Sequence, residues 1–291
     1  MKRKQIRVTL ILSDKEETFT ADGQNALSAT GFRVLADVSY GNGAILPIAF
    51  VKIYGLSAEK MNKLLRVQWN TMGALMNKVR LEAGNHGEEL HNVFEGNITF
   101  AYPDYSESPN IALVIEAQSA SEHLIRAADP VTHEGQVDVV TLIELIVKRI
   151  GLDFKNDGFS KQVSNITLND TDIAKILRLS RAYEFDYYLD GNLITITEQG
   201  KPRKLKVPVI TPKTGLIGYP VPSIKGIDFK CLYDPLVRFG AVVRIKDSII
   251  EPANGDWKIY GLRLVLEANQ PNGAWFCEVN ATWSNAEDAA I

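Results

Sequence analysis

Apolar and polar residues alternate with a period of two through most of this 291-residue chain. Near its start, Ile6, Val8, Leu10 and Leu12 fall on one side of such an alternation. Side chains of a β-strand point alternately to two faces, so this spacing predicts strands with one buried face. Further runs of the same kind cover residues 32–39, 45–56, 79–83, 93–101, 111–117, 205–210, 227–232, 237–245, 257–267 and 274–283. The sequence therefore predicts a mainly β protein.

Helical spacing interrupts the strand pattern in two places. Residues 57–78 contain a short helix signal, with Ser57 as a candidate N-cap and apolar residues at helical spacing after it. Residues 121–200 contain stronger helix signals over 138–150 and 172–183, followed by a hairpin signal in which Asp190–Gly191 forms the turn. We therefore expect a helical insertion in the first β region and a small α/β insert after it.

A repeat links the two β-rich regions. Lys52–Leu56 recurs unchanged as Lys258–Leu262. Two looser matches follow in the same order: Leu81–Asn85 with Leu266–Gln270, and Glu95–Phe100 with Glu278–Trp283. We interpret the repeat as two related β units in one chain. Such units leave strand edges that barrel closure or pairing with neighbouring chains must satisfy, and three copies would present six similar units around an axis.

Composition and charge narrow the possible functions. There are 32 Lys and Arg residues against 35 Asp and Glu residues, which gives a net charge of -3. This balance gives no reason to expect specific nucleic-acid binding, which depends on an excess of cations. Two cysteines cannot make a disulfide scaffold, and no apolar run reaches the roughly 18–20 residues of a membrane span. We expect a protein without a membrane anchor, made in a reducing cytoplasm.

Residue types that carry chemistry do not form a recognisable constellation. His86 and His91 are five positions apart, which fits neither a helical metal pair nor a zinc protease motif. Gly41-Asn42-Gly43 lacks the third glycine of a dinucleotide loop. Acidic residues cluster in loops, among them Asp104 and Glu107, and are typical of a solvated surface. We therefore expect no catalytic residue, no cofactor and no metal.

The C-terminal third contains a series of short sequence segments that resembles a known family. Its parts are Gly215–Pro222, Gly226–Leu232, Asp234–Gly240, Asn254–Ile259 and Gly273–Phe276. Together these segments resemble the tail-hub, or baseplate hub, proteins of contractile-tailed bacteriophages. Those proteins are relatives of the hub part of type VI secretion spike proteins. The resemblance is strongest over residues 205–283. The order of a β unit, an α/β insert and a second β unit extends it over the whole chain.

The resemblance implies an assembly role. Hubs of this family are homotrimers whose paired tail-tube-like β-barrels form a pseudo-hexameric ring between the trimeric spike and the hexameric tail tube, and they contact the tape-measure protein. It therefore implies two tail-tube-like β-barrel units, at residues 1–120 and 201–291, separated by a small α/β domain at 121–200. The expected location is the virion baseplate, after assembly in the host cytoplasm. A separate spike is an expected partner, because no β-helical needle follows the second unit.

Particular residues carry the three functional hypotheses. For a structural, non-enzymatic hub we expect packing or junction roles for Tyr54, Pro220, Trp257, Tyr260 and Trp275. One alternative is a tail-associated cell-wall hydrolase that uses the loop carboxylates Asp104 and Glu107. The other is a carbohydrate-binding receptor module in which Trp69 stacks on sugars.

Overall fold

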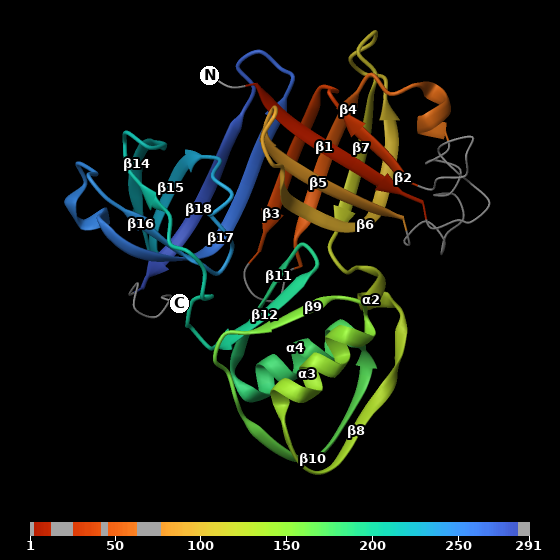
Figure 1. Ribbon diagram of the computed structural model, residues 1–291, viewed down its shortest axis with the longest axis vertical. Coiled ribbons are helices and arrows are strands. Elements are labelled where there is room, and N and C mark those ends of the chain that lie inside the picture. The colour runs from red at the N-terminus through yellow and green to blue at the C-terminus, as the bar shows by residue number, and fades with distance from the viewer. Residues whose placement is uncertain (1–2, 13–25, 42–45, 63–76, 285–291) are drawn as a thin grey trace.

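The computed structural model describes residues 3–12, 26–41, 46–62 and 77–284 (Figure 1). As the period-two pattern predicts, the described chain is mainly β. Its strands form one large sheet of 13 strands and two small sheets of two and three strands. The two long helices pack on the strands of the small sheets, in the lower part of Figure 1. No helix among the described residues is long and apolar enough to cross a bilayer.

The first seven strands precede residue 120. They are β1 (Lys4–Ile11), β2 (Ala26–Thr30), β3 (Val34–Tyr40), β4 (Ile48–Tyr54), β5 (Lys78–Asn85), β6 (His91–Asp104) and β7 (Ala112–Gln118). They pair side by side in the order β3-β4-β7-β6-β5-β1-β2. The sheet curls, so that β1 and β5 cross over β3, β4 and β7 (Figure 1). Val8 and Leu81 from one end thereby share a buried core with Val38, Val51 and Ile115 from the other.

The insert follows, with its own apolar core. Its elements are α2 (Glu122–Ile125), β8 (Ala127–Asp138), α3 (Val139–Arg149), β9 (Asp153–Asn156), β10 (Gln162–Thr171), α4 (Asp172–Tyr183), β11 (Phe185–Asp190) and β12 (Leu193–Glu198). Asp138 caps the start of α3, and its carboxylate accepts a hydrogen bond from the Val140 N–H. The buried stripes of α3 and α4, including Ile143 and Ile176, meet in this core. Gly151 follows α3 with a φ of 73°, a conformation that glycine adopts readily.

The remaining strands extend the large sheet. They are β13 (Val209–Ile210), β14 (Leu216–Ser223), β15 (Gly226–Leu232), β16 (Val242–Ile245), β17 (Gly255–Ala268) and β18 (Trp275–Trp283), and η2 (Glu251–Ala253) is a short 3-10 helix. Four of them pair in the order β14-β15-β18-β17. Strand β17 then pairs with β3 of the first region over seven residues, from Leu262 opposite Tyr40 to Ala268 opposite Val34.

The β17–β3 ladder changes the expected architecture. Two separate β-barrel units were predicted, but the described residues contain no closed barrel, and both β regions share one sheet. On the side away from β18, the first residues of β17 pair with β16 and its later residues pair with β3. The sheet therefore continues into the first β region and stays open. The period-two pattern specifies the buried face of each strand and leaves the choice of neighbour open.

The sequence repeat corresponds only in part to equivalent structure. Hairpins β5–β6 and β17–β18 are both antiparallel, and Arg80 faces Glu95 in the first as Arg263 faces Glu278 in the second. The nitrogen–oxygen distances of these ion pairs are 2.8 and 3.2 Å. The identical pentapeptides begin in β4 and lie within β17, and each of these strands pairs antiparallel with the strand before it, β3 for β4 and β16 for β17. The two copies differ in their place along the strand, because Gly55 and Leu56 follow the end of β4 whereas Gly261 and Leu262 lie inside β17.

The helical insertion is described only at its start. Residues 58–62 are helical, and the Ser57 hydroxyl accepts a hydrogen bond from the Lys60 N–H at 3.4 Å. This is the N-cap that the sequence predicts. Residues 63–76, which include Trp69, lie outside the described residues.

Candidate interaction surface

Eight strands of the large sheet present one open face. In the order β14-β15-β18-β17-β3-β4-β7-β6 they come equally from the two β regions. Residues in direct register across seven of them are partly or fully exposed and point to the same side: Phe100, Glu116, Phe50, Asp37, Val265, Phe276 and Leu232. Alternate residues on the same strands are buried in the core. We call this surface the open face.

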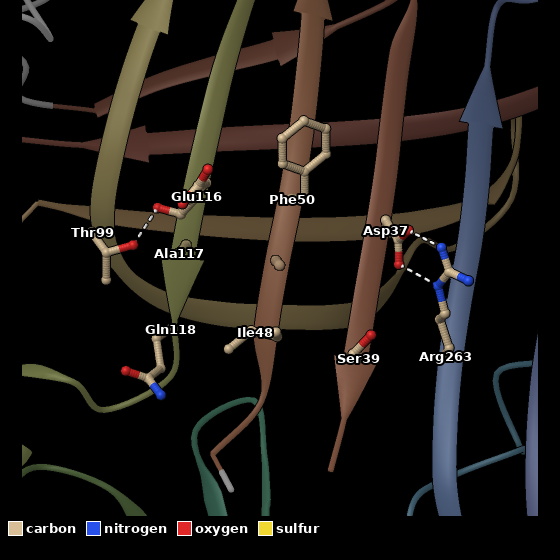
Figure 2. A pocket seen from close by; sticks show the side chains of 10 residues that line it. Asp37, Ser39, Ile48, Phe50, Thr99, Glu116, Ala117, Gln118 and Arg263 are labelled. Carbon is tan, nitrogen blue, oxygen red and sulfur yellow. Dashed lines mark hydrogen bonds and ion pairs between the residues drawn. The ribbon is translucent and has the colours of Figure 1, made fainter.

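A shallow hollow lies where the two β regions meet on the open face (Figure 2). Its volume is about 450 Å³, and Asp37, Phe50, Glu116 and Arg263 are among the residues that line it. The lining residues shown in Figure 2 come from β6, β7, β4, β3 and β17, which are adjacent in the sheet, and they form a band across it. A broad, shallow surface of this kind, lined by both apolar and charged side chains, suits contact with a macromolecule better than enclosure of a small ligand.

An ion-pair network spans the joint between the two β regions. The Arg263 guanidinium donates to both carboxylate oxygens of Asp37, at 2.9 and 2.5 Å, and to Glu278 at 3.2 Å (Figure 2 shows the Asp37 pair). Hydrogen bonding to Asp37 raises the pKa of Arg263 above its ordinary value. The bidentate hydrogen bonds between Arg263 and Asp37 fix the register of β17 against β3. Half of the Arg263 side chain is exposed to solvent, which weakens the contribution of the ion pair to stability.

Asp104, one of the two proposed hydrolase carboxylates, is held in its ionised form. It accepts hydrogen bonds from the hydroxyl and backbone N–H of Ser106 and from Lys52 at 3.1 Å. These interactions lower its pKa from 3.8 to about 2. A glycosidase acid needs a raised pKa instead. Glu107 lies in the exposed turn after β6, so the two carboxylates do not share an enclosed cleft.

The two tryptophans that the sequence singled out are buried packing residues. Trp257 donates its indole N–H to the Ala253 carbonyl at 2.8 Å, and its ring meets Trp283 edge-on at 5.2 Å. Trp275 meets Tyr233 edge-on at 5.6 Å. Both therefore anchor the interior of the second β region.

The other three predicted residues lie apart from one another. Tyr54 ends β4 and stacks under the Arg33 guanidinium, 4.3 Å from the ring centre. Pro220 is a buried residue of β14, at the outer end of the sheet. Tyr260 lies at the other end of the second β region, beside the insert, in a cavity of about 310 Å³ that Asp186 also lines. The structure does not gather the five predicted residues into one site.

Sequence reasoning missed a buried charge cluster that ties the insert to both β regions. Asp190 accepts from Arg203 at 3.0 Å and from Arg238 at 3.2 Å. Arg238 also donates to the Asn92 carbonyl in β6 at 3.0 Å. Arg203 is only 2% exposed and also binds the Phe239 carbonyl at 3.0 Å. The only sequence signal was Asp190–Gly191, which indicates a turn and gives no sign of the two arginine partners.

One known protein family matches most of the chain. The family model described as baseplate hub gp41 matches residues 6–273. No curated protein matches the chain in sequence.

Solved structures resemble the chain over almost its whole length. The tail protein from Neisseria meningitidis MC58 has a TM-score of 0.60 at 10% identity, covering 98% of this chain and 99% of that chain. The 43 kDa tail protein of prophage MuSo2 from Shewanella oneidensis has a TM-score of 0.59 at 9% identity, covering 100% of both. The E. coli c3393 protein, a component of the type VI secretion system, has a TM-score of 0.59 at 12% identity, covering 89% and 76%. At such low identity these likenesses concern the fold alone.

Proposed function

Because this chain belongs to the baseplate hub gp41 family, we propose that it forms a homotrimeric, pseudo-hexameric ring in a bacteriophage tail. In this role it is a structural protein of the virion baseplate. The ring adapts a spike with threefold symmetry to a tail tube with sixfold symmetry. Its partners are other copies of itself, the spike protein, the tube protein and the tape-measure protein.

One observation carries the proposal: both β regions contribute four strands each to the same open face. Three chains would then supply six four-stranded segments around one axis, which is the number a sixfold tube requires. In this account each β region is one tail-tube-like unit, and the barrel is completed by assembly rather than within a single chain. Closing a sheet through neighbouring copies removes its free edges.

The division of the chain follows from the same proposal. Residues 1–120 and 201–291 form the two ring units, and residues 121–200 form the insert domain. The two separate hydrophobic cores support this division, since the second consists of Leu46 and residues between 131 and 196. The Asp190 cluster holds the insert against both ring units, so we expect the insert to move with the ring as one body.

The proposed role needs no catalysis. Asp104, held ionised by Ser106 and Lys52, is a poor general acid, and the described residues contain no cluster of three or more potential metal ligands. We propose that the protein is non-enzymatic and is assembled in the host cytoplasm before incorporation into the virion.

The mass of the purified protein in solution tests the proposed ring. Sedimentation equilibrium combined with light scattering should give three times the 32.3 kDa chain mass. A trimer that binds its spike and tube proteins in co-purification would support the adaptor role. A twofold dimer, or a chain that stays monomeric at every concentration and with spike and tube proteins present, contradicts it.

A further inference from the structure

The open face ends in two strand edges that have no strand partner among the described residues. One edge is β14, which pairs only with β15. The other is the second half of β6. Residues 78–83 of β5 pair with β6 as far as Asn97, and residues 99–104 of β6 then pair only with β7. Unpaired edges present free backbone groups that promote contact with another chain.

Both edges carry exposed apolar side chains. On β14, Tyr219 and Val221 are 57% and 60% exposed, and Ile217 is also exposed. On the free half of β6, Phe100 is 52% exposed, and its ring lies 5.4 Å from that of the exposed Tyr102. Clustered exposed apolar residues of this size indicate an interaction site. The two clusters lie on different strands at opposite ends of the eight-stranded face.

The strand directions favour contact between unlike edges. All seven pairings within the eight strands are antiparallel, so β14 and β6 run in opposite directions. A second copy rotated about an axis along the strands would therefore place its β14 antiparallel to β6 of the first copy. The alternation of strand direction then continues from one copy to the next.

The charges beside the edges are complementary. Two exposed lysines, Lys213 and Lys225, flank β14 at its two ends. Two exposed glutamates lie beside the free half of β6: Glu107 follows its end, and Glu116 is in register with Phe100 on β7. An antiparallel approach brings Lys213 toward Glu107. Contact between two β14 edges would instead bring the lysines together, which disfavours a twofold dimer.

Prolines limit backbone pairing at both edges. Pro220 and Pro222 lie in β14, and Pro103 lies in the free half of β6. Proline has no backbone N–H and cannot donate to a neighbouring strand. A strand edge that contains proline therefore pairs less readily with the strands of other proteins. Side-chain complementarity must therefore provide most of a specific contact here.

We propose that β14 of one copy docks on residues 99–104 of β6 in the next copy. Ile217, Tyr219 and Val221 pack against Phe100 and Tyr102, and the flanking lysines face the glutamates. The contact is head-to-tail, since each copy uses a different edge toward each neighbour, and repeated rotation closes it into a ring. This inference rests on the proposed trimeric hub and names its closing contact.

Two charge variants test the contact by sedimentation velocity. Val221→Glu places a carboxylate toward the acidic edge, and Phe100→Lys places an ammonium toward the basic edge. Each variant alone should lose the trimer at concentrations where the unaltered protein is fully trimeric. A mixture of equal amounts should form a two-chain species, because one unaltered β14 edge and one unaltered β6 edge remain. Leu145→Glu, at an exposed apolar site on α3 of the insert, is the matched control and should stay trimeric.

Chemical cross-linking gives a second measurement that does not depend on loss of assembly. Cys231 and Cys277 are buried, so cysteines introduced at residues 100 and 221 are the ones a bis-maleimide reaches. The double variant Phe100→Cys, Val221→Cys should give covalent trimers on a denaturing gel. Each single variant should remain a single chain on that gel.

The outcomes separate this inference from the proposed function. If the unaltered protein is trimeric and both charge variants stay trimeric, the β14–β6 contact is wrong and the hub ring stands. Covalent dimers from Val221→Cys alone would show a twofold β14 contact and overturn the head-to-tail arrangement. An unaltered protein that is monomeric at all concentrations tested contradicts the β14–β6 contact; if it also remains monomeric with spike and tube proteins present, it contradicts the ring as well.

Discussion

The Asp190 carboxylate is the residue on which the attachment of the insert depends most. It lies between the guanidinium groups of Arg203 and Arg238, and both arginines also bind backbone carbonyls of the β regions. Removing the charge of Asp190 leaves two cations close together and largely out of water. Breaking a buried ion pair by removing one partner is much more costly than losing a surface pair.

We therefore expect Asp190→Asn to lower the free energy of unfolding by about 3 kcal/mol. The measurement is urea unfolding followed by tryptophan fluorescence. Asp153→Asn, at an exposed end of β9, is the control and should change stability by less than about 0.5 kcal/mol. Equal effects of the two substitutions would show that the cluster does not stabilise the fold.

The Arg263 network on the open face should contribute less, because it is half exposed. We expect Asp37→Asn to cost about 0.5–1 kcal/mol despite the two-pronged geometry. The loss should shrink in 1 M salt, which screens exposed charges. Thermal unfolding at low and high salt measures both effects. A loss above about 3 kcal/mol would mean that this pair, rather than the ladder between β17 and β3, holds the two regions together.

Asp104 gives a pH-dependent prediction. Its pKa falls from 3.8 to about 2 because Ser106 and Lys52 favour the ionised form. A carboxyl group with a lowered pKa stabilises the fold above its ordinary pKa, and this contribution is lost as the pH falls from about 4 to 2. Asp104→Asn should therefore be less stable than the unaltered protein at neutral pH, and the difference should close over that range. Chemical unfolding at several pH values measures it, and a difference that persists unchanged at pH 2 contradicts the assignment.

The same carboxylate separates the structural role from a cell-wall hydrolase. We expect the purified protein to release no soluble fragments from peptidoglycan, because Asp104 stays ionised and Glu107 is exposed to solvent. Release of labelled fragments measures turnover. Robust turnover that Asp104→Asn or Glu107→Gln abolishes would overturn the non-enzymatic assignment.

Individual elements differ in how well the sequence predicts them. Helices α3 and α4 were predicted because each carries a continuous apolar stripe and a capping residue, Asp138 and Thr171. Strands β8 and β10 were not, because most of their residues are exposed and show no apolar alternation. β14 was missed for another reason. Pro220 and Pro222 argue against an internal strand, and the sequence does not reveal that β14 is an edge.

Gly226, the first residue of β15, offers a test of how closely β15 packs against β18. Gly226 has a φ of 149°, and an added Cβ would lie 2.2 Å from the Ala281 carbonyl oxygen. Gly218 also has a positive φ, 69°, but open space around it. We expect Gly226→Ala to cost about 3 kcal/mol, from backbone strain plus a forced shift, and Gly218→Ala about 1 kcal/mol. Urea unfolding measures both, and equal costs would contradict the close approach of β15 to β18.

For the molecule as a whole, the sequence predicts the class and order of parts better than their joining. The alternation in β3 and β17 indicates which residues are buried, and both strands do bury that face. The apolar–polar alternation of β3 and of β17 does not indicate that these two distant strands pair, because a strand with one apolar face fits many neighbours. The predicted pair of barrels was therefore replaced by one open sheet. The residues of the open face and the Asp190 cluster come together only because β17 pairs with β3.

The proposed hub depends on the two β regions of each chain acting together as adjacent segments of a ring. Electron cryomicroscopy of the purified assembly tests it most directly. We predict a closed ring of three chains, with six similar sheet segments around the axis and β17 adjacent to β3 in every chain. A ring with two detached barrels per chain, or an assembly with twofold symmetry only, would contradict it.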